Sequence, residues 1–521
     1  MKILYYNWVD YLDTENRGGG VSVYLKNLMT HLGAKDGVDV RFVSSGISYD
    51  ILEPKPRWEK VQHGPRKDRD LRFEIINSGA LAPGHHSFGH DAQIEHPATV
   101  EAFYDFMEKN GPFDIVHFNN LEGIPASLVG LKERFPETRV ILSLHNYFPV
   151  CPQVNLWYQE RENCIDFRGG EKCGDCLEWQ PYPDEVRLAN AVAYRFKKAG
   201  IEPGGFLFRR GFGLAVRFWS KALRVSKSWS KSSRDVLAFG RTSRDGNVAV
   251  RGPLKPVKGY AQTFGPRRAR VVEIINQNCD RVLCVSDRVG VVAAKFGIAP
   301  ELLQTSYIGT KHAELWEKTT PKQSLLNSDG TLTLAYMGYM RRDKGFYFLM
   351  RALATLPKSL AERVRVVVCA RTGDHEAVQL MHKASSNVKE ILHADGYKHD
   401  ELDKLLAEVD VGVVPVQWED NLPQVAIEMH ARHIPLLTSN LGGAQELGNT
   451  PEMVFRANSF ESFHQRIRAI LEGEIDLDAY WANAMPPVSM EKHEDELLGI
   501  YRDLIDGRGR TLPVAEAAAA E

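Results

Sequence analysis

The chain has 521 residues, of which 43% are hydrophobic and 25% charged, with 42 Gly and 26 Pro. This near-average composition excludes disordered, collagen-like and coiled-coil chains, and the length favours two large domains with insertions. The net charge of −2 hides an uneven distribution, because residues 184–270 hold 20 Lys and Arg against 5 Asp and Glu.

The amino-terminal sequence and the cysteine content indicate a cellular compartment. No apolar run reaches the length of about 18 residues that a membrane span requires, and the chain opens directly on strand-like residues 2–7. We therefore expect a cytoplasmic protein without a signal peptide. Seven cysteines in so long a chain then indicate thiols or metal ligands rather than a disulfide framework.

Short β-branched runs alternate with helix-period segments, which is the pattern of parallel sheets with crossover helices. The first series predicts strands near 2–7, 38–44, 72–77, 114–119, 139–146, 281–286 and 303–308. The second predicts strands near 332–338, 364–370, 390–396, 411–416, 434–439 and 453–456. The fold class is therefore α/β, with two doubly wound, Rossmann-like domains.

The domain boundaries follow from the composition of the connecting segments. A first domain over 1–315 carries insertions at 53–97 and 147–268, and a turn-rich linker covers 316–330. The second domain covers 331–488, and a helix and tail at 489–521 follow it. Such domains bind ligands at the carboxyl ends of their strands, so we expect functional residues on strand-to-helix loops.

The first such loop is rich in glycine. Gly18, Gly19 and Gly20 precede a helical segment at 21–28. Bare backbone N–H groups at the start of a helix favour an anion such as a diphosphate. A flexible turn is the alternative.

The second insertion holds a cysteine cluster. Cys151, Cys164, Cys173 and Cys176 have the spacing C-x12-C-x8-C-x2-C, which fits a closed tetrahedral zinc site of structural role. An iron–sulfur cluster and uncoordinated thiols are the alternatives.

Residues 205–224 mix aromatic and basic side chains at roughly helical spacing. The segment contains Phe206, Phe208, Phe212, Phe218 and Trp219 among Arg209, Arg210, Arg217, Lys221 and Arg224. Such a segment can lie on an anionic membrane surface. A basic helix that packs on the protein explains it equally well.

Two loops of the second domain carry charged residues. The first strand ends in Gly338 and continues through Arg341, Arg342 and Lys344, which are placed to neutralise phosphate. After the strand at 411–416, Asp420 precedes a helix that Pro423 starts. The backbone amides of Asn421 and Leu422 should then face the cleft, and Glu428 lies about two turns along that helix.

These residues together carry a resemblance to a known family. They include Gly18 to Gly20, Asp114-Ile-Val-His117, Ser143-Leu-His145, Val285-Ser286, Gly338 with Lys344-Gly345, the acid pair Asp420 and Glu428, and Gly442-Gly443-x2-Glu446. Their order resembles that of the retaining GT-B glycosyltransferases of family 4, over roughly 1–50, 112–150 and 278–475. The resemblance implies transfer of a sugar from a nucleotide diphosphate sugar to an acceptor hydroxyl, with retention of configuration and no catalytic metal.

The resemblance also implies roles for single residues. Lys344 would bind the donor diphosphate, Asp420 the hydroxyls of the transferred sugar and Glu428 the nucleotide ribose. His145 would contact the donor sugar near the reaction centre. Tyr339 stands where the family usually has Arg, so a second cation would come from Arg341 or Arg342.

The predicted function is therefore transfer to a glycan or lipid-linked acceptor in surface polysaccharide biosynthesis, in the cytoplasm, with peripheral contact at the inner face of the membrane if residues 205–224 bind headgroups. One alternative is a nucleic-acid-binding protein in which the cysteines and residues 184–270 form a basic zinc module. It lacks a groove-reading motif and leaves Asp420 to Glu446 unexplained, so no nucleic acid partner is expected. A GT-B epimerase or sugar-nucleotide sensor is the other alternative.

Overall fold

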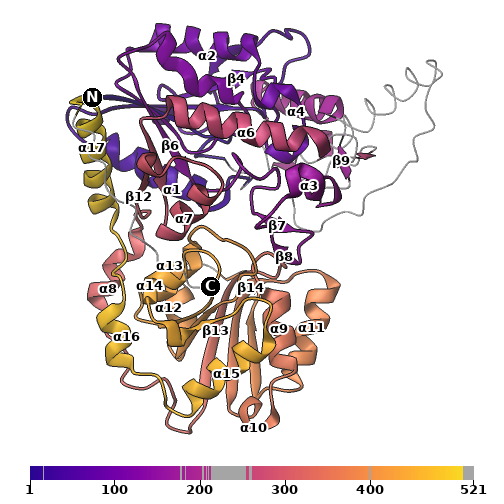
Figure 1. Ribbon diagram of the computed structural model, residues 1–521, viewed down its shortest axis with the longest axis vertical. Helices are drawn as coiled ribbons and strands as arrows, with labels where there is room; N and C mark the ends of the chain where they lie inside the picture. Colours follow the sequence, from indigo (N-terminus) through magenta and orange to yellow (C-terminus); the bar gives the residue numbers. More distant parts are fainter. Residues whose placement is uncertain are drawn as a thin grey trace, which may run out of the picture.

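The computed structural model contains two lobes, each built on a parallel sheet (Figure 1). It describes residues 1–521 except 14, 16, 88, 177–178, 182, 202–204, 207, 209, 213–253, 257–260, 398–400 and 508–521. Two doubly wound α/β domains are therefore confirmed.

The first domain contains an eight-stranded sheet in the order β12-β11-β6-β5-β1-β2-β4-β3. Its strands are β1 (Lys2–Tyr6), β2 (Asp39–Ser45), β3 (Arg57–Lys60), β4 (Arg72–Ile76), β5 (Ile115–Phe118), β6 (Arg139–Leu144), β11 (Arg281–Cys284) and β12 (Leu303–Thr305). Seven coincide with the predicted strands. The other, β3, lies in the insertion at 53–97 and runs antiparallel to β4.

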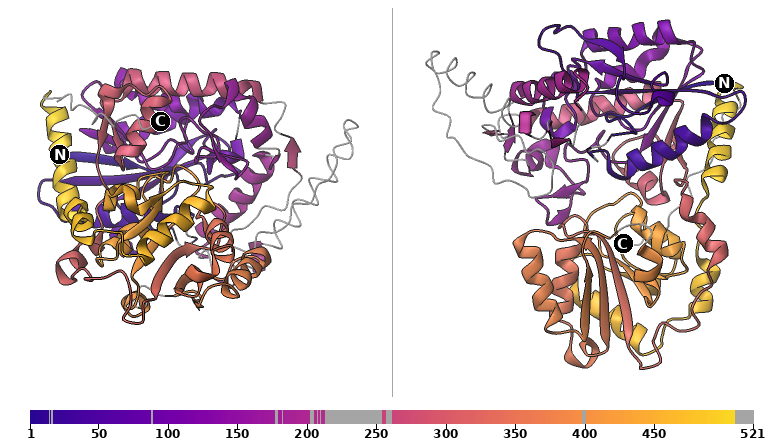
Figure 2. Two further views of the ribbon diagram at one scale, coloured as in Figure 1. Left: turned by 60° about the horizontal axis from the view of Figure 1, so that its bottom comes forward. Right: turned by 180° about the vertical axis from the view of Figure 1, so that it is seen from behind.

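The helices of this domain are α1 (Gly19–Leu32), α2 (Pro97–Asn110), α3 (Glu171–Cys176), α4 (Pro183–Lys198), α6 (Ala261–Asn278) and α7 (Asp287–Lys295). The second insertion adds two small antiparallel pairs, β7 (Trp157–Tyr158) with β8 (Glu162–Asn163) and β9 (Trp179–Pro181) with β10 (Leu254–Pro256). The β7–β8 hairpin extends from the first lobe toward the second (Figures 1 and 2).

The second domain contains a six-stranded parallel sheet in the order β15-β14-β13-β16-β17-β18. Its strands are β13 (Leu332–Tyr339), β14 (Val364–Arg371), β15 (Glu390–Ala394), β16 (Val411–Val414), β17 (Leu436–Ser439) and β18 (Val454–Phe455). Its helices are α9 (Phe346–Ala354), α10 (Lys358–Ala361), α11 (His375–Ser385), α12 (Leu402–Leu406), α13 (Gln424–His430), α14 (Gln445–Gly448), α15 (Phe460–Leu471) and α16 (Leu477–Asn483). Each strand matches a predicted one.

The chain crosses between the lobes twice, through α8 (Glu314–Lys318) and again before α17 (Met490–Ile505). Helix α17 packs on α1 of the first domain (Figure 2). The hydroxyl of Tyr501 lies 2.9 Å from that of Tyr5 and 2.7 Å from Nδ1 of His117. A buried polar network therefore fixes the carboxyl-terminal helix to the first sheet.

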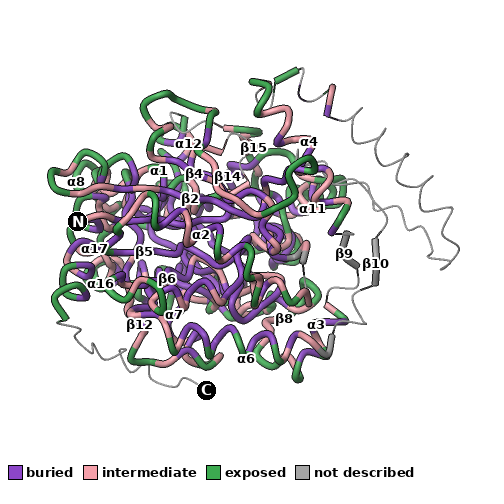
Figure 3. Tube along the Cα trace, turned by 90° about the horizontal axis from the view of Figure 1, so that it is seen from above, coloured by how far each residue is buried: buried purple, intermediate pink, exposed green. Residues whose placement is uncertain are grey.

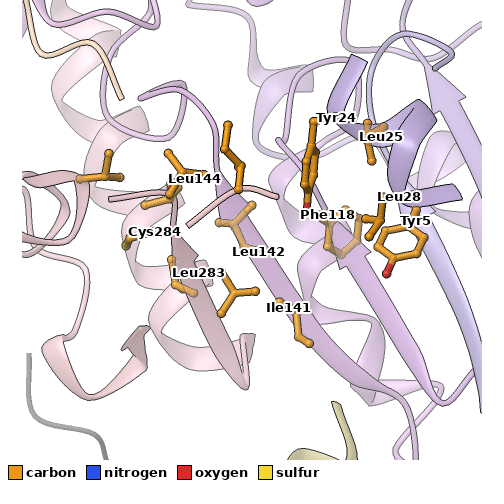
Figure 4. Packing of buried hydrophobic residues seen from close by; sticks show 14 of the residues in the cluster. Tyr5, Tyr24, Leu25, Leu28, Phe118, Ile141, Leu142, Leu144, Leu283 and Cys284 are labelled. Atoms are coloured by element: carbon orange, nitrogen blue, oxygen red, sulfur yellow. The ribbon is translucent and has the colours of Figure 1, made fainter. Parts of the chain in front are cut away.

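Apolar side chains cover both faces of the first sheet, as expected for parallel strands under helices. The residues of β5 are all buried (Figure 3), and so are those of β11. Leu25 and Leu28 of α1 pack in one cluster with Phe118 and Leu142 (Figure 4). Burying such a side chain contributes about 1.5–3 kcal/mol, so this core holds the strand ends, and the loops that follow them, in place.

The basic insertion is described only in part. Phe208 and Phe212 are buried and stack with ring centroids 5.4 Å apart beside Phe196 of α4, whereas Phe206 is 71% exposed. The packing alternative therefore holds for two of the predicted aromatic residues. Phe218, Trp219, Arg209, Arg217, Lys221 and Arg224 lie outside the described residues. Within the described ranges, no helix is both long and apolar enough to cross a bilayer.

Candidate active site

The predicted site residues lie on loops that follow strands of both sheets. Gly18–Gly20 follow β1 and His145 follows β6 in the first domain, whereas Lys344 follows β13 and Asp420 follows β16 in the second. A Cβ atom on Gly20 would lie 3.3 Å from Cγ of Gln424 in α13. The glycine loop therefore faces the start of α13 across the domain interface.

Lys344 and Asp420 form the central ion pair. Nζ of Lys344 lies 2.9 Å from Oδ2 of Asp420, and their side chains are 32% and 10% exposed. Desolvation opposes the charge of Lys344, but attraction to Asp420 and Asp343 outweighs it and raises the lysine pKa. Lys344 is therefore an ammonium ion at neutral pH, and it lies between the two loops.

Glycines permit the close approach of these loops. Gly442 has φ of +74°, and a Cβ atom there would lie 2.1 Å from the carbonyl oxygen of Asp420. The neighbouring N–H of Gly443 donates to that carbonyl at 3.0 Å. Gly345 also has φ of +74°, and its Cβ atom would lie 1.7 Å from the carbonyl oxygen of Pro415. Any other residue would displace the loop that carries Asp420.

The two arginines expected beside Lys344 contact other acids. Nε of Arg341 donates to Asp343 at 2.9 Å, and Nη2 of Arg342 donates to Glu376 of α11 at 2.6 Å. Arg342 also lies over the ring of Tyr347, with 4.3 Å to its centroid. Of the cations predicted in this loop, Lys344 is the one whose side chain contacts Asp420.

Asn421 links the second domain to the first. Its Nδ2 donates to the carbonyl oxygen of Leu144 at 3.1 Å, immediately before His145. Its own carbonyl accepts from the hydroxyl of Ser286 at 2.9 Å. Leu422 is buried beside it. The side chain and carbonyl of Asn421 thus bind the first domain, a contact that the sequence did not predict; that its backbone amide faces the cleft stays a prediction.

Glu428 is buried on α13. Its Oε1 lies 3.7 Å from Nε2 of His312, a residue between β12 and α8. Asp420 lies in the loop just before α13, so both acids belong to one loop-and-helix segment.

His145 follows β6 with its Nε2 3.1 Å from Oδ1 of Asn119, and its ring lies 5.1 Å from that of Tyr24. Burial lowers its pKa to about 3, and repulsion from His493 adds to the shift. The imidazole is therefore neutral at physiological pH and can exchange hydrogen bonds without carrying charge.

Sequence reasoning missed an ion pair between the domains. Arg288 of α7 donates to both carboxylate oxygens of Glu419, which also accepts the N–H of Gly442 at 3.0 Å. Glu446 of α14 accepts the backbone N–H groups of Asp287 and Arg288 at 3.0 and 2.7 Å. An acid at the start of α7 suits the positive end of the helix dipole. Glu419 and Asp420 are adjacent in the sequence, and two neighbouring carboxylates could have indicated two separate cations, which are Arg288 and Lys344 in the structure.

The glycine loop itself is tightly constrained. Gly19 has φ of +53°, and a Cβ atom on Gly18 would lie 1.9 Å from Oγ of Ser22 and 2.5 Å from Cγ1 of Val9. The requirement for glycine is thus steric at Gly18 and conformational at Gly19, whether or not an anion binds.

The four cysteines that were predicted to staple a loop through a metal line one cavity, but as placed they do not form a metal-binding group. In the described part of the chain, no three His, Cys, Asp or Glu side chains form a group that could hold a metal ion. The four sulfurs are free thiols. They do share one cavity of about 20 Å3, which Cys151, Cys164, Cys173 and Cys176 line together. The zinc ion itself stays a prediction.

Comparisons with known proteins agree with this geometry. Residues 317–486 match the family Glycosyl transferases group 1. A curated relative, spore coat protein SA of Bacillus subtilis, is 24% identical over 217 residues, which cover 38% of this chain. The alignment spans 57% of that relative, less than two-thirds of its length.

Solved structures share the whole fold at low identity. Sucrose-phosphate synthase of Thermosynechococcus elongatus has a TM-score of 0.51 and 14% identity, and covers 97% of this chain and 100% of its own. HepE of Anabaena, in complex with UDP, has a TM-score of 0.50 and 12% identity, with 96% and 100% covered. The lipopolysaccharide outer core galactosyltransferase WaaB has a TM-score of 0.52 and 8% identity, with 98% and 100% covered.

The family match covers the domain that carries Lys344, Asp420 and Glu428, and the structural likeness extends the GT-B fold to the rest of the chain. Residues 317–486, which hold these three side chains, therefore match the group 1 glycosyltransferases.

Proposed function

We propose that the protein is a retaining glycosyltransferase that moves a sugar from a nucleotide diphosphate sugar to a glycan or glycolipid acceptor, in surface polysaccharide biosynthesis. The observation that carries the proposal is the ion pair between Lys344 and Asp420, 2.9 Å apart on loops that follow neighbouring strands. A cation and a carboxylate side by side suit a ligand that carries phosphates next to sugar hydroxyls.

Lys344 then stabilises the charge that develops on the departing diphosphate. Desolvated and fixed charges act most strongly where charge appears in the transition state. Gly20 lies across the interface from α13, and the open space at Gly19, where an added Cβ would meet no atom within 4 Å, leaves room for phosphate oxygens close to the backbone. Asp420 accepts hydrogen bonds from the hydroxyls of the transferred sugar, and Glu428 accepts them from the ribose.

The reaction breaks the bond between the sugar carbon and the diphosphate oxygen, and forms a bond from that carbon to the acceptor oxygen. The acceptor proton passes to the departing phosphate, which lies on the same face of the sugar. His145, neutral at working pH, orients the donor sugar by hydrogen bonding. The protein contributes position and electrostatics rather than an acid–base pair.

The acceptor side is proposed from the first domain. A lipid-linked acceptor would place the protein at the cytoplasmic face of a membrane, with the segment 205–224 near anionic headgroups. Flotation with anionic and with neutral vesicles tests this placement. Retention on anionic vesicles that salt abolishes supports it, and equal indifference to both vesicle types contradicts it.

A thermal-shift screen of nucleotide diphosphate sugars tests the donor. UDP-sugars come first, because HepE was solved with UDP on the same fold. A ligand at about 100 times its Kd stabilises the folded state by about 2.7 kcal/mol. The responding donor is then incubated with glycan and lipid-linked acceptors, and the anomeric configuration of the product is determined.

The outcomes separate the competing functions. Acceptor-dependent release of the nucleotide with retention supports the proposal. Conversion of the donor to an isomer without an acceptor indicates an epimerase, and binding without turnover indicates a sensor. Salt-sensitive retention on RNA or DNA with no donor response indicates a nucleic-acid-binding protein. Glu428→Gln should chiefly weaken nucleotide binding, so an unchanged donor Kd in that variant contradicts its role.

A further inference from the structure

The four cysteine side chains converge on one small cavity. Cys151 follows β6, Cys164 follows β8, and Cys173 and Cys176 lie in α3. The cavity of about 20 Å3 has room for about one water molecule or ion. Water needs several polar partners, and thiols are weak ones. Four sulfurs around a space of this size are better suited to a single soft cation.

Hydrogen-bond donors point at two of the sulfurs. The N–H of Leu156 donates to Sγ of Cys151 at 3.4 Å, and the N–H of Gln159 donates to Sγ of Cys176 at 3.2 Å. Nε2 of Gln153 donates to the same sulfur at 2.7 Å. Donors around a sulfur orient it, as the second shell of a metal site does.

A buried cation beside the cavity lacks a counterpart. Arg268 lines the cavity, is 7% exposed, and has no hydrogen-bond partner for Nη1 in the described structure. Its guanidinium lies 3.4 Å from the centroid of the Phe167 ring. A buried charge without a partner costs several kcal/mol. Four thiolates around a divalent ion carry a net charge of about −2, which would offset that cost.

We propose that Cys151, Cys164, Cys173 and Cys176 bind one zinc ion as a closed tetrathiolate site, which fixes the β7–β8 hairpin against the second domain. As placed, the described side chains form no metal-binding group, so binding requires the sulfurs to rotate about their Cα–Cβ bonds toward the cavity. Each thiol releases its proton to solvent as it binds. A closed site of this kind leaves no position for a substrate, so its role is structural.

The hairpin connects this site to the loop that carries Asp420. Nδ2 of Asn163 donates to Oε1 of Glu419 at 2.9 Å, and Nδ2 of Asn458 donates to the carbonyl of Arg161 at 3.2 Å. Glu419 in turn binds Arg288 and the N–H of Gly442. Loss of the ion should therefore loosen both the hairpin and residues 417–421. The consequence for sugar transfer rests on the proposed function, whereas the metal site does not.

Elemental analysis of the purified full-length protein tests the site without a donor. We expect about one zinc per chain in the wild type, and none above background in Cys173→Ser. Cys369→Ala is the matched control, because Cys369 is a buried thiol on β14 of the other domain, and should retain its zinc. Arg268→Met should bind zinc about 10- to 100-fold more weakly than the wild type, as measured by competition with a chelator.

Hydrogen exchange tests the connection to the second domain. Chelation of the wild-type protein should raise exchange at 157–163 and at 417–421, and should leave β13 unchanged. No zinc in the wild type, iron with sulfide in its place, or equal zinc in Cys173→Ser and the control each overturns the site. Zinc that is present but whose removal leaves both segments unchanged overturns the link. Neither readout depends on sugar transfer, so a failed proposed function would be recognised separately.

Discussion

One side of the candidate site holds charged side chains, whereas the other side holds neutral ones. Around Asp420, the side chains are ionised and paired, with Lys344 on Asp420 and Arg288 on Glu419. Around His145, the side chains are neutral. Burial lowers the pKa of His117 and of His145 to about 3, and that of His493 to about 4. Both sides are desolvated, so burial alone does not decide the charge.

The difference lies in the partner. Asp420 keeps Lys344 charged against the cost of desolvation. Burial lowers the pKa of His117 and of His145, no carboxylate of the described residues opposes it there, and repulsion from neighbouring histidines adds to the shift. The ionised side suits a diphosphate, and the neutral side suits hydroxyl groups. Under the proposed function, Lys344 thus meets the donor phosphates from the second domain, and His145 meets the sugar hydroxyls from the first domain, opposite Asp420.

Removing the ammonium group should have the largest effect. Lys344→Ala deletes the cation that the proposed function places against the leaving group, so kcat should fall by about 10²- to 10³-fold, or about 3–4 kcal/mol. Donor affinity should change less, because the contact strengthens as the bond breaks. Steady-state kinetics on the identified donor measure both quantities.

Lys389→Ala is the control for this change. Lys389 pairs with Asp329 at 3.2 Å on the second domain, away from Asp420, and its loss should leave kcat unchanged. Wild-type turnover in Lys344→Ala would show that the ionised side of the interface does not face the donor phosphates.

The loop beneath Asp420 should tolerate no side chain at Gly442. Gly442→Ala combines a positive φ with a Cβ atom 2.1 Å from the carbonyl of Asp420, so the free energy of unfolding should fall by about 2–3 kcal/mol and kcat with it. Gly473→Ala separates the two causes, since φ there is +76° with no atom within 4 Å of the added Cβ. We expect it to lose about 1 kcal/mol of stability and to keep its turnover. Equal losses of stability in both variants would show that the positive φ alone, and not the contact with Asp420, causes the loss.

The pair between the domains should contribute less. Arg288→Met leaves Glu419, which is 2% exposed, with one partner fewer, and Arg288 itself is 34% exposed. Because solvent screens the arginine, we expect a loss of about 2 kcal/mol rather than the larger value of a fully buried pair. The double variant with Glu419→Gln should lose less than the sum of the single variants in urea unfolding. Strict additivity would mean that the two side chains do not couple.

The sequence predicted the sheets well because parallel strands under helices are continuous apolar runs, which a single chain shows directly. β3 was missed because Arg57 to Lys60 alternates charges in a Pro-rich insertion. Lys344 and Asp420 could be chosen because each follows a strand end. Their contact needed the structure, since it depends on the neighbouring positions of β13 and β16 in the sheet.

Arg341, Arg342 and Arg288 show the limit of such reasoning. Three cations near strand ends are equivalent in sequence, and only their partners distinguish them. Asp343 and Glu376 hold Arg341 and Arg342 away from Asp420. Arg288 reaches Glu419 across the domain interface, 131 residues away in the chain. The cysteine spacing likewise predicted a shared environment, which the cavity provides, but not the buried Arg268 beside it.

The neutral side of the site makes the smallest prediction, which is a dependence of stability on pH. His493 packs against Tyr24, and its folded pKa of about 4 lies below its ordinary value of 6.5. Between these values the unfolded chain binds more protons than the folded one, so stability is full above pH 6.5 and falls as the pH decreases. One such histidine should cost about 1 kcal/mol between pH 6.5 and 5.5.

Urea unfolding of the wild type and of His493→Gln across this range isolates the contribution, because carboxylates titrate equally in both proteins. His382→Gln, an exposed histidine on α11, is the control and should keep the wild-type slope. A His493→Gln slope equal to that of the wild type would mean that folding does not lower the pKa of this imidazole, and that the two sides of the site differ less in charge than their burial indicates.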